Sequence, residues 1–234
     1  MVEVEGKEGI QEILSRSAPR GWVLEPDAMR ILMLAGLTVP RFIVAATPAE
    51  TQDAARQIGY PLVAKVVSPD VLHKSEVHGV EVGIESEDRL LHTFERLSSI
   101  QGFTGMIVEE IVNGLELILG AQNDSQFGPM ILLGIGGTSV EIYHDISLRM
   151  APLEPRDVGQ LADRLRGRKL LDGYRGSEPI SREELTGNVL AFSRFIMDFH
   201  DSIQSVDINP LKCTAKSCTA VDARIMLVSN PTSS

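Results

Sequence analysis

The sequence predicts an α+β fold (mixed α/β) with two subdomains that divide near residue 113. Three observations lead to this prediction. Strand-like and helical patterns alternate before Asn113-Gly114, whereas several strand-like runs follow one another directly after it. The helical patterns have recognisable cap and stop residues. The regular strand–helix alternation of a doubly wound sheet is absent, so neighbouring strands are expected to pair antiparallel.

The first half is expected to contain three helices. Each has apolar residues at helical spacing, and the second and third begin at Thr47 and Ser86, whose side chains suit an N-cap. The expected helices are 25–36, 47–59 and 86–100. Short apolar runs between them predict strands at 39–45, 62–67, 79–84 and 105–112.

The second half begins with three expected strands, separated by a polar turn and by a glycine-rich loop. These strands are 115–122, 129–133 and 146–153. Two helices are then expected, at 155–171 and 181–199. The chain ends with strands at 203–211 and 219–228, which a short turn joins.

The expected domain map follows from these elements. Residues 1–20 are charged and weakly periodic, so we expect an N-terminal tail there, in which a helical turn could form. Residues 21–113 and 114–228 are expected to form the two subdomains, and residues 229–234 a C-terminal tail.

Composition limits the class of protein. The 234 residues are 43% hydrophobic and 23% charged, as in ordinary soluble domains, and the formal net charge is −10. This charge argues against a nucleic-acid partner, which would need a basic face. No apolar run approaches the roughly 20 residues that span a bilayer, and the acidic start is unlike a signal peptide. We therefore expect a cytoplasmic protein with no membrane partner.

The two cysteines, Cys213 and Cys218, flank a short polar turn and could face each other across a hairpin. Two cysteines alone make neither a metal cage nor a disulfide framework. Because cytoplasmic thiols are kept reduced, we expect two reduced cysteines without a catalytic role.

Lys65 is the only charged residue in the apolar run 62–67. Taken alone, it would most often be an edge-strand lysine with its amine in water. A polar loop at 68–79 follows it, however, and a lysine beneath such a loop is a common way to hold nucleotide phosphates. The loop has the spacing of neither a P-loop nor a dinucleotide-binding turn.

Two further groups of polar residues accompany strands. Residues 108–116 contain Glu109, Glu110 and Glu116 around a short apolar link, which could offer backbone groups to a purine and a carboxylate to a ribose. The alternative is a pair of solvated acids at a strand end. Asp207 and Asn209 share one face of a strand by period-2 alternation, and Asp222 is expected on the adjacent strand. Such oxygen ligands suit magnesium.

Together these features resemble the ATP-grasp superfamily, in which two subdomains hold nucleotide in the cleft between them. More narrowly, the chain is similar to the nucleotide-binding beta subunit of ADP-forming acetyl-CoA synthetases, from about residue 21 to residue 227. The succinyl-CoA synthetase beta subunit is a more distant resemblance. The matching segments are 60–65, 68–75, 126–129, 170–176 and 207–210.

The resemblance implies roles for the nucleotide-binding residues. Lys65 would contact phosphate, and Glu109 with the backbone of Glu110, Ile111 and Val112 would face the adenine. Glu116 would bind the ribose. The loop at Gly136 and Gly137 would help to stabilise transferred phosphate.

The resemblance also implies catalytic and metal-binding roles. His73 would accept the phosphoryl group, Asp207 would orient its imidazole, and Arg149 would stabilise transferred phosphate. Asn209 and Asp222 would hold magnesium (Mg2+). His78 stands where the family usually has glycine, so either histidine of this loop could carry the phosphate.

The implied enzyme is an acid–thiol ligase, an ADP-forming acetate–CoA ligase that transfers phosphate between a phosphohistidine and ADP to form ATP. The chain is too short to hold a CoA-binding domain, so the implied partner is a CoA-binding alpha subunit in an α2β2 heterotetramer. ATP/ADP would be the substrate nucleotide.

Two alternatives remain open from the residues. One is an ATP-grasp carboxylate–amine or carboxylate–thiol ligase that works through an acyl phosphate and does not need His73. The other is a non-catalytic nucleotide-binding regulatory subunit, against which the intact Lys65, Glu116, Asn209 and Asp222 argue. The acid, the choice between ADP and GDP, and the stoichiometry are not determined by the sequence.

Overall fold

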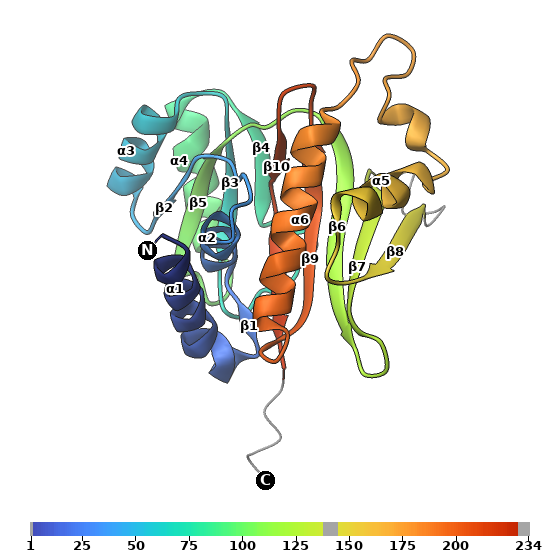
Figure 1. Cartoon of the computed structure of the whole chain (residues 1–234). Coiled ribbons are helices and arrows are strands. Elements are labelled where there is room, and N and C mark those ends of the chain that lie inside the picture. Colours follow the sequence, from blue (N-terminus) through green and yellow to red (C-terminus); the bar gives the residue numbers. More distant parts are fainter. Residues whose placement is uncertain (1, 138–144, 229–234) are drawn as a thin grey trace. The chain divides into compact units, whose positions relative to one another are not determined.

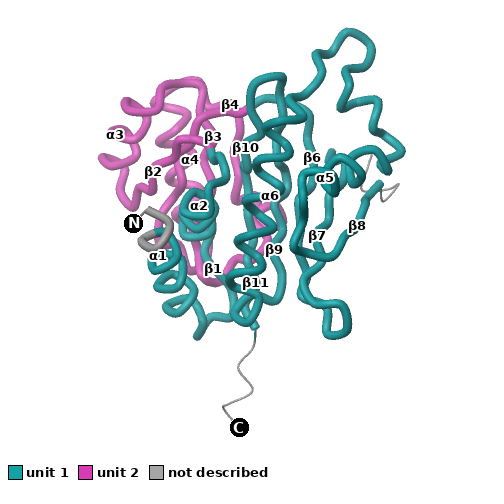
Figure 2. The backbone as a smooth tube through the Cα atoms, viewed as in Figure 1, with its two compact units in different colours: residues 1–39, 113–234 teal, residues 40–112 magenta. Residues whose placement is uncertain are grey.

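The computed structural model describes residues 2–137 and 145–228 (Figure 1). The chain divides into two compact units (Figure 2). Unit 1 comprises Met1–Val39 and Asn113–Ser234, and unit 2 comprises Pro40–Val112. The expected tail at 229–234 lies outside the described residues.

Unit 2 is a four-stranded sheet covered on one face by two helices. The strand order is β2-β5-β3-β4, and every pair is antiparallel. Its elements are β2 Phe42–Ala45, α3 Pro48–Ile58, β3 Leu62–Val67, β4 Val80–Ile84, α4 Glu87–Ser98 and β5 Gly105–Glu110. Thr47 and Ser86 cap the two helices as expected, each accepting a hydrogen bond from a backbone N–H three residues later.

The core of unit 2 lies between this sheet and its helices. Leu62, Ala64 and Val66 point from β3 toward Leu90 and Leu97 of α4, and all are almost completely buried. Because strand side chains alternate between faces, Val63 and Lys65 point to the opposite face of the sheet. The sequence of β3 therefore places a lysine directly behind an apolar core.

Unit 1 is built on a seven-stranded antiparallel sheet. Its order is β1-β11-β9-β6-β7-β8, and β10 also pairs with β9. The strands are β1 Trp22–Val23, β6 Leu115–Asp124, β7 Gly128–Ile135, β8 Ile146–Met150, β9 Ile203–Cys213, β10 Cys218–Ala220 and β11 Ala223–Leu227. The helices are α1 Val2–Ser17, α2 Glu25–Leu34, α5 Pro155–Asp163 and α6 Arg182–Phe199. The predicted α+β class is thus confirmed.

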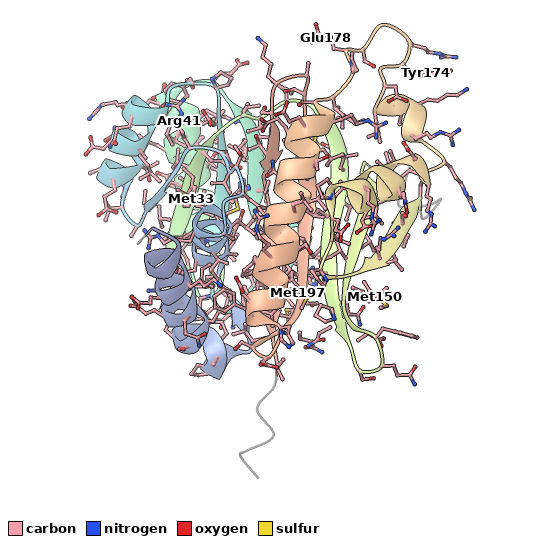
Figure 3. All side chains as sticks on the ribbon, viewed as in Figure 1. Met33, Arg41, Met150, Tyr174, Glu178 and Met197 are labelled. Carbon is pink, nitrogen blue, oxygen red and sulfur yellow. A yellow bond between two sulfur atoms is a disulfide. The ribbon has the colours of Figure 1, made fainter. Side chains whose placement is uncertain are left out.

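Helices α5 and α6 pack on β7 to β10 (Figure 1). The expected helix 155–171 is shorter than predicted, because α5 ends at Asp163 and only a 3₁₀ turn, Arg168–Leu170, follows. The segment between α5 and α6 carries the exposed side chains of Tyr174 and Glu178 (Figure 3). None of the described helices is long and apolar enough to pass through a lipid bilayer.

The expectation of an N-terminal tail at residues 1–20 is wrong. Helix α1 occupies most of this segment, and Ile10, Ile13 and Leu14 form a buried stripe at helical spacing. Residues 21–39 were expected in the same subdomain as residues 40–113. They belong instead to unit 1, together with the second half of the chain. The reason is a long-range pairing, in which Trp22 and Val23 lie opposite Met226 and Ile225 at the edge of the large sheet.

The expectation of two reduced cysteines is also wrong, because Cys213 and Cys218 form a disulfide. The antiparallel register of β9 and β10 places the two residues directly opposite each other, with their Cα atoms 4.1 Å apart. The turn between them is closed by a hydrogen bond from Thr214 N–H to the Ser217 carbonyl (2.8 Å). Register, which cysteine counting does not reveal, determines this pairing.

Candidate functional site

The site residues of unit 2 centre on an ion pair. Lys65 Nζ lies 2.7 Å from Glu109 Oε1, and the two side chains are only 4% and 1% exposed. Both lie on the sheet face opposite the helices, because Glu109 of β5 pairs with Val63, two residues before Lys65. Lys65 is therefore not a solvated lysine on an edge strand, because β3 is an interior strand with β5 and β4 on its two sides.

Glu110 ends β5 and is held in place by Arg41. Its carboxylate accepts hydrogen bonds from the Arg41 backbone N–H (2.9 Å) and from Arg41 Nε (2.8 Å). Burial tends to raise the pKa of Glu110, but the hydrogen bonds and charge of Arg41 outweigh it, so the pKa is lowered. Ile111 and Val112 follow outside the strand. The link that is expected to face a purine therefore starts from a fixed position.

His73 lies in the loop between β3 and β4, where it precedes the 3₁₀ turn Lys74–Val77. Its side chain is exposed, as are those of Leu72 and His78. His78 ends the turn with a positive φ of 52°. The two histidines thus differ in backbone role, because one precedes the turn and the other terminates it.

The site residues of unit 1 lie on one face of the large sheet. Asp207 of β9 pairs with Arg224 of β11, and Arg224 NH2 lies 3.5 Å from Asp207 Oδ2. Two residues further along, the backbone N–H of Asn209 donates to the Asp222 carbonyl (3.2 Å). Directly opposite residues on antiparallel strands share a face, so Asp207, Asn209, Asp222 and Arg224 form one polar group.

A β-bulge in β9 extends this polar face. Leu119 and Leu117 of β6 pair with Ile208 and Leu211 of β9, so three steps along β9 match two steps along β6. The extra residue lies at Asn209-Pro210. The bulge keeps Leu211 in the core at 0% exposure and turns the next residue, Lys212, to the polar face.

Lys212 and Arg224 were not anticipated as site residues. Lys212 pairs with Glu116 of β6, and its Nζ lies 3.4 Å from Glu116 Oε1. Strict alternation from Asp207 would turn Lys212 toward the core, so only the bulge reveals it. The expected strand 219–228 is divided into β10 and β11, and Asp222 lies directly before β11. Arg224 could still have been found from the sequence, because it follows Asp222 by two residues in an extended segment.

Gly136 and Gly137 follow β7 beside Glu116. The Gly136 N–H donates to the Glu116 carbonyl (2.7 Å), and a Cβ at Gly136 would lie only 3.0 Å from that oxygen. Close approach of the two backbones therefore explains this glycine. Because its N–H is already engaged, Gly136 does not offer that donor to a phosphate, contrary to expectation. Gly137 has a φ of +93°, in the region that favours glycine. A Cβ added at Gly137 would lie 3.8 Å from Glu116 Oε2.

Arg149 does not join the polar face. Its partner across the strands is Ile131, which pairs with Ala121, which in turn pairs with Val206. This series lies on the face opposite Asp207. Arg149 there contacts α5, where NH2 lies 2.8 Å from Asp157 Oδ1 and NH1 donates to Gln160 Oε1 (2.6 Å). The expected catalytic role of Arg149 is therefore not supported, and its contacts are those of a residue that fastens α5 to the sheet.

The carboxyl group of Asp207, on this polar face, has a raised pKa. Burial raises its pKa, and the positive charge of Arg224 opposes the rise without cancelling it. Perturbed carboxyls of this kind gather at functional sites. A carboxylate next to a guanidinium can also orient an imidazole, by accepting a hydrogen bond at one ring nitrogen.

The polar face fits a magnesium ion better than a transition metal. Asn209 and Asp222 offer only oxygen ligands, which hard divalent cations prefer. In the described residues, no group of three or more His, Cys, Asp or Glu side chains could hold a metal. A cation here would thus take its remaining ligands from water and a phosphate, as magnesium often does.

The expected residues thus form two groups. The unit 2 group contains Lys65, Glu109 to Val112 and the His73 loop. The unit 1 group contains Glu116, Gly137, Asp207, Asn209 and Asp222, and the structure adds Lys212 and Arg224 to it. In unit 2 the cation Lys65 and the carboxylate of Glu109 lie on one face of the sheet, and in unit 1 Lys212 and Arg224 lie on the same face as Glu116 and Asp207. Local cations of this kind can attract a phosphorylated ligand although the chain is acidic overall.

An ATP-grasp domain family matches residues 15–227. The chain is 33% identical to the beta subunit of ADP-forming acetate–CoA ligase I of Pyrococcus furiosus, over 88% of this chain and 91% of that subunit. It is 36% identical to ADP-forming acetate–CoA ligase I of Archaeoglobus fulgidus, over 97% of this chain. The match covers 34% of the Archaeoglobus protein, so the chain spans about a third of that relative.

A solved structure is similar over nearly the whole chain. It is the dinucleotide-forming acetyl-coenzyme A synthetase 1 of Candidatus Korarchaeum cryptofilum, with coenzyme A and Mg-AMPPCP and with its phosphohistidine segment pointing towards the nucleotide-binding site. The TM-score is 0.82 at 32% identity, and the match covers 94% of this chain and 100% of that chain.

Proposed function

Because the chain belongs to the ATP-grasp family, among the beta subunits of ADP-forming acetate–CoA ligases, we propose that it transfers phosphate reversibly between His73 and a nucleotide. The overall reaction is the conversion of acyl-CoA, ADP and inorganic phosphate into the acid, CoA and ATP. The observation that carries the proposal is the exposed His73, in a loop that follows directly on β3 with its buried Lys65.

The unit 2 group binds the nucleotide in this proposal. Lys65 contacts a phosphate, and the carboxylate of Glu109 with the backbone of Glu110 to Val112 faces the adenine. The ion pair between Lys65 and Glu109 keeps both charges compensated when no nucleotide is bound, because an isolated buried charge would be very unfavourable. Lys65 thus stays charged and oriented for a phosphate.

The unit 1 group completes the proposed set of ligands. Glu116 binds the ribose hydroxyls, and Asn209 and Asp222 hold magnesium, which would offset negative charge on the phosphates when bound. Asp207 orients the His73 imidazole so that the second ring nitrogen is available to phosphorus. Gly137 is a backbone donor for transferred phosphate.

The transfer step is a displacement at phosphorus. In the direction of ATP formation, a terminal oxygen of ADP attacks the phosphoryl group on His73. The P–N bond breaks, and the ring nitrogen keeps the bonding electron pair. Lys65 stabilises the charge that develops on the phosphoryl oxygens, which is the main requirement for this kind of transfer.

The test is to incubate the full chain with γ-labelled ATP and magnesium and to follow protein-bound label. The proposal expects acid-labile, base-stable label that maps to the His73 peptide and disappears in His73→Ala. An ATP-grasp ligase that works through an acyl phosphate would give no protein-bound label, and neither would a non-catalytic regulatory subunit. Either result would overturn the proposal.

A partner is part of the proposal. Pyrococcus furiosus has a relative named as a beta subunit, whereas the Archaeoglobus relative is about three times the length of the matching region. We propose that a CoA-binding alpha subunit supplies the acyl-CoA chemistry, in a cytoplasmic α2β2 heterotetramer. Native mass measurement of the two co-expressed polypeptides tests this stoichiometry, and formation of acyl-CoA by this chain alone would contradict it.

A further inference from the structure

The loop that carries His73 is fastened at its first end. Ser68 is buried, and its Oγ donates to the Gln101 carbonyl (2.7 Å) and accepts from the Asp70 N–H (3.1 Å). Thr104 donates from both its N–H and its hydroxyl to the Val67 carbonyl, at 2.9 and 3.0 Å. Residues 67–70 are therefore attached to the turn between α4 and β5.

The second end of the loop is also fastened, by close packing at Gly79. Gly79 N–H donates to the Lys74 carbonyl (2.7 Å) across the 3₁₀ turn, and Val66 N–H donates to the Gly79 carbonyl (2.8 Å). A Cβ at Gly79 would lie 2.6 Å from Val66 Cγ1 and 2.9 Å from the Lys74 carbonyl oxygen. Close packing therefore explains the glycine at this position, and Gly79 anchors the second end of the loop.

Arg96 of α4 links this anchor to the sheet. One guanidinium nitrogen, NH1, donates to the His78 carbonyl, and the other, NH2, donates to Glu81 Oε2 (2.8 Å). Arg89, about two helix turns earlier, donates from Nε to Glu81 Oε1 (2.7 Å). Arg89 and Arg96 therefore share Glu81, but only Arg96 has a hydrogen bond to the loop in the described part of the structure.

The shared acid holds Arg96 in a fixed direction. The Glu81 side chain is 17% exposed. Burial tends to raise its pKa, but the hydrogen bonds and charges of the two arginines outweigh it, so the pKa is lowered. A guanidinium can serve a carboxylate and a carbonyl at the same time, because its donors are arranged as a rigid fork. A lysine ammonium is a compact point charge without this fork.

Between its two anchors the loop exposes Leu72, His73 and residues 75–77. The peptide groups that are hydrogen-bonded at each end of the loop set the direction in which this exposed part leaves the sheet. At the second end these are the peptide groups of His78 and Gly79. His78 has an uncommon positive φ for a non-glycine residue, so it needs contacts that hold it there.

We propose that Arg96 is a positioning residue for phosphoryl transfer through His73, because it fixes the His78 carbonyl and thereby the point from which the His73 segment is presented. The proposal rests on the proposed phosphohistidine function. Arg96 touches no reacting atom in this proposal. It acts through the backbone of the loop.

The experiment measures the rate of His73 labelling by γ-labelled ATP and magnesium in the full chain, together with nucleotide affinity and thermal midpoint. The variants are Arg96→Ala, Arg96→Lys and the matched control Arg89→Ala. Both alanine variants remove one arginine from Glu81, so both should lose similar stability. Arg96→Ala should label about tenfold more slowly or worse at unchanged nucleotide affinity, because a charge-assisted hydrogen bond to the loop is lost. Arg89→Ala should label within about twofold of the wild-type rate, since its loop contact is intact.

Arg96→Lys keeps the positive charge and should fold. It therefore tests the proposal even if Arg96→Ala does not fold. It should label at an intermediate rate. Trypsin cleavage after Lys74 gives a local measure, and it should be faster in Arg96→Ala than in Arg89→Ala. Equal slowing by the two alanine variants, or wild-type labelling in both Arg96 variants, would overturn the role of Arg96. The absence of label in the wild-type chain would instead contradict the proposed function itself.

Discussion

Lys65 and Glu109 form an ion pair of 2.7 Å in which both side chains are almost completely buried. Removing one partner leaves an uncompensated buried charge, so Lys65→Met or Glu109→Gln alone should destabilise the chain by about 3–5 kcal/mol. The double variant should recover much of this loss, because neither charge remains. Denaturant unfolding of the three variants measures the effect.

The same variants separate stability from binding. If Lys65 contacts phosphate, the double variant should bind nucleotide about tenfold to a hundredfold more weakly although its fold is intact, since a charge-assisted contact contributes about 1.5–3 kcal/mol. Isothermal titration with ADP tests this expectation. Wild-type affinity in the stable double variant would remove Lys65 from the site.

The adjacent positions of Asn209 and Asp222 predict that they act on one magnesium ion. Asp222→Asn and Asn209→Ala should each raise the magnesium concentration needed for nucleotide binding by about tenfold or more, because magnesium depends on few protein oxygens. Asp201→Asn is the matched control, since Asp201 is an exposed acid shortly before the same strand. The idea fails if the control shifts the magnesium dependence as much as the two site variants do.

Arg149 lies on the helix-covered face, which gives a prediction opposite to its expected role. Arg149→Ala should leave the rate of His73 labelling within about twofold of wild type. It should lower stability by about 1–3 kcal/mol, because Asp157 and Gln160 lose a charged partner. Parallel measurement of labelling and unfolding distinguishes the two roles. A large loss of labelling without a loss of stability would restore Arg149 to the site.

The raised pKa of Asp207 predicts a pH dependence of stability. The folded chain binds this proton more tightly than the unfolded chain, whose aspartates titrate near about pH 3.9. Stability therefore falls as the pH rises from about 4 through the raised pKa, because in this range the folded state binds more protons than the unfolded state. Asp207→Asn should lack this fall, and Arg224→Gln should move it to higher pH. Unfolding free energies across the acidic range measure both shifts.

The sequence allowed the short-range features of the fold to be predicted. Strand β3 and the caps at Thr47 and Ser86 depend on local alternation and local hydrogen bonds, so the pattern indicated them directly. The errors concern long-range pairing. The contact of Trp22 with β11 brings residues 21–39 into unit 1, and no local pattern reveals it.

The same distinction applies to the site. Asp207 and Asn209 share a face because alternation holds along that part of β9, and Asp222 lies opposite Asn209. Beyond Asn209 a bulge shifts the alternation, so Lys212 was missed. Arg149 was misplaced because a resemblance in sequence does not state which face of a sheet a side chain occupies. Only the register across β6, β7 and β8 decides this.

The choice between His73 and His78 gives the last prediction. His78 terminates the 3₁₀ turn with a positive φ, and its carbonyl is held by Arg96. Its position is therefore fixed at the base of the loop. His73 precedes the turn on the exposed part, between the two anchors. A phosphate carrier has to reach a partner site and return, so the exposed segment between the anchors is the part of the loop suited to this movement.

His73→Ala should abolish acyl-CoA-dependent ATP synthesis by the assembled enzyme while nucleotide affinity stays near wild type. His78→Asn, which keeps a residue tolerant of positive φ, should retain most of the activity. If the effects are reversed, the carrier is His78, and if both variants are fully active, this loop carries no phosphate.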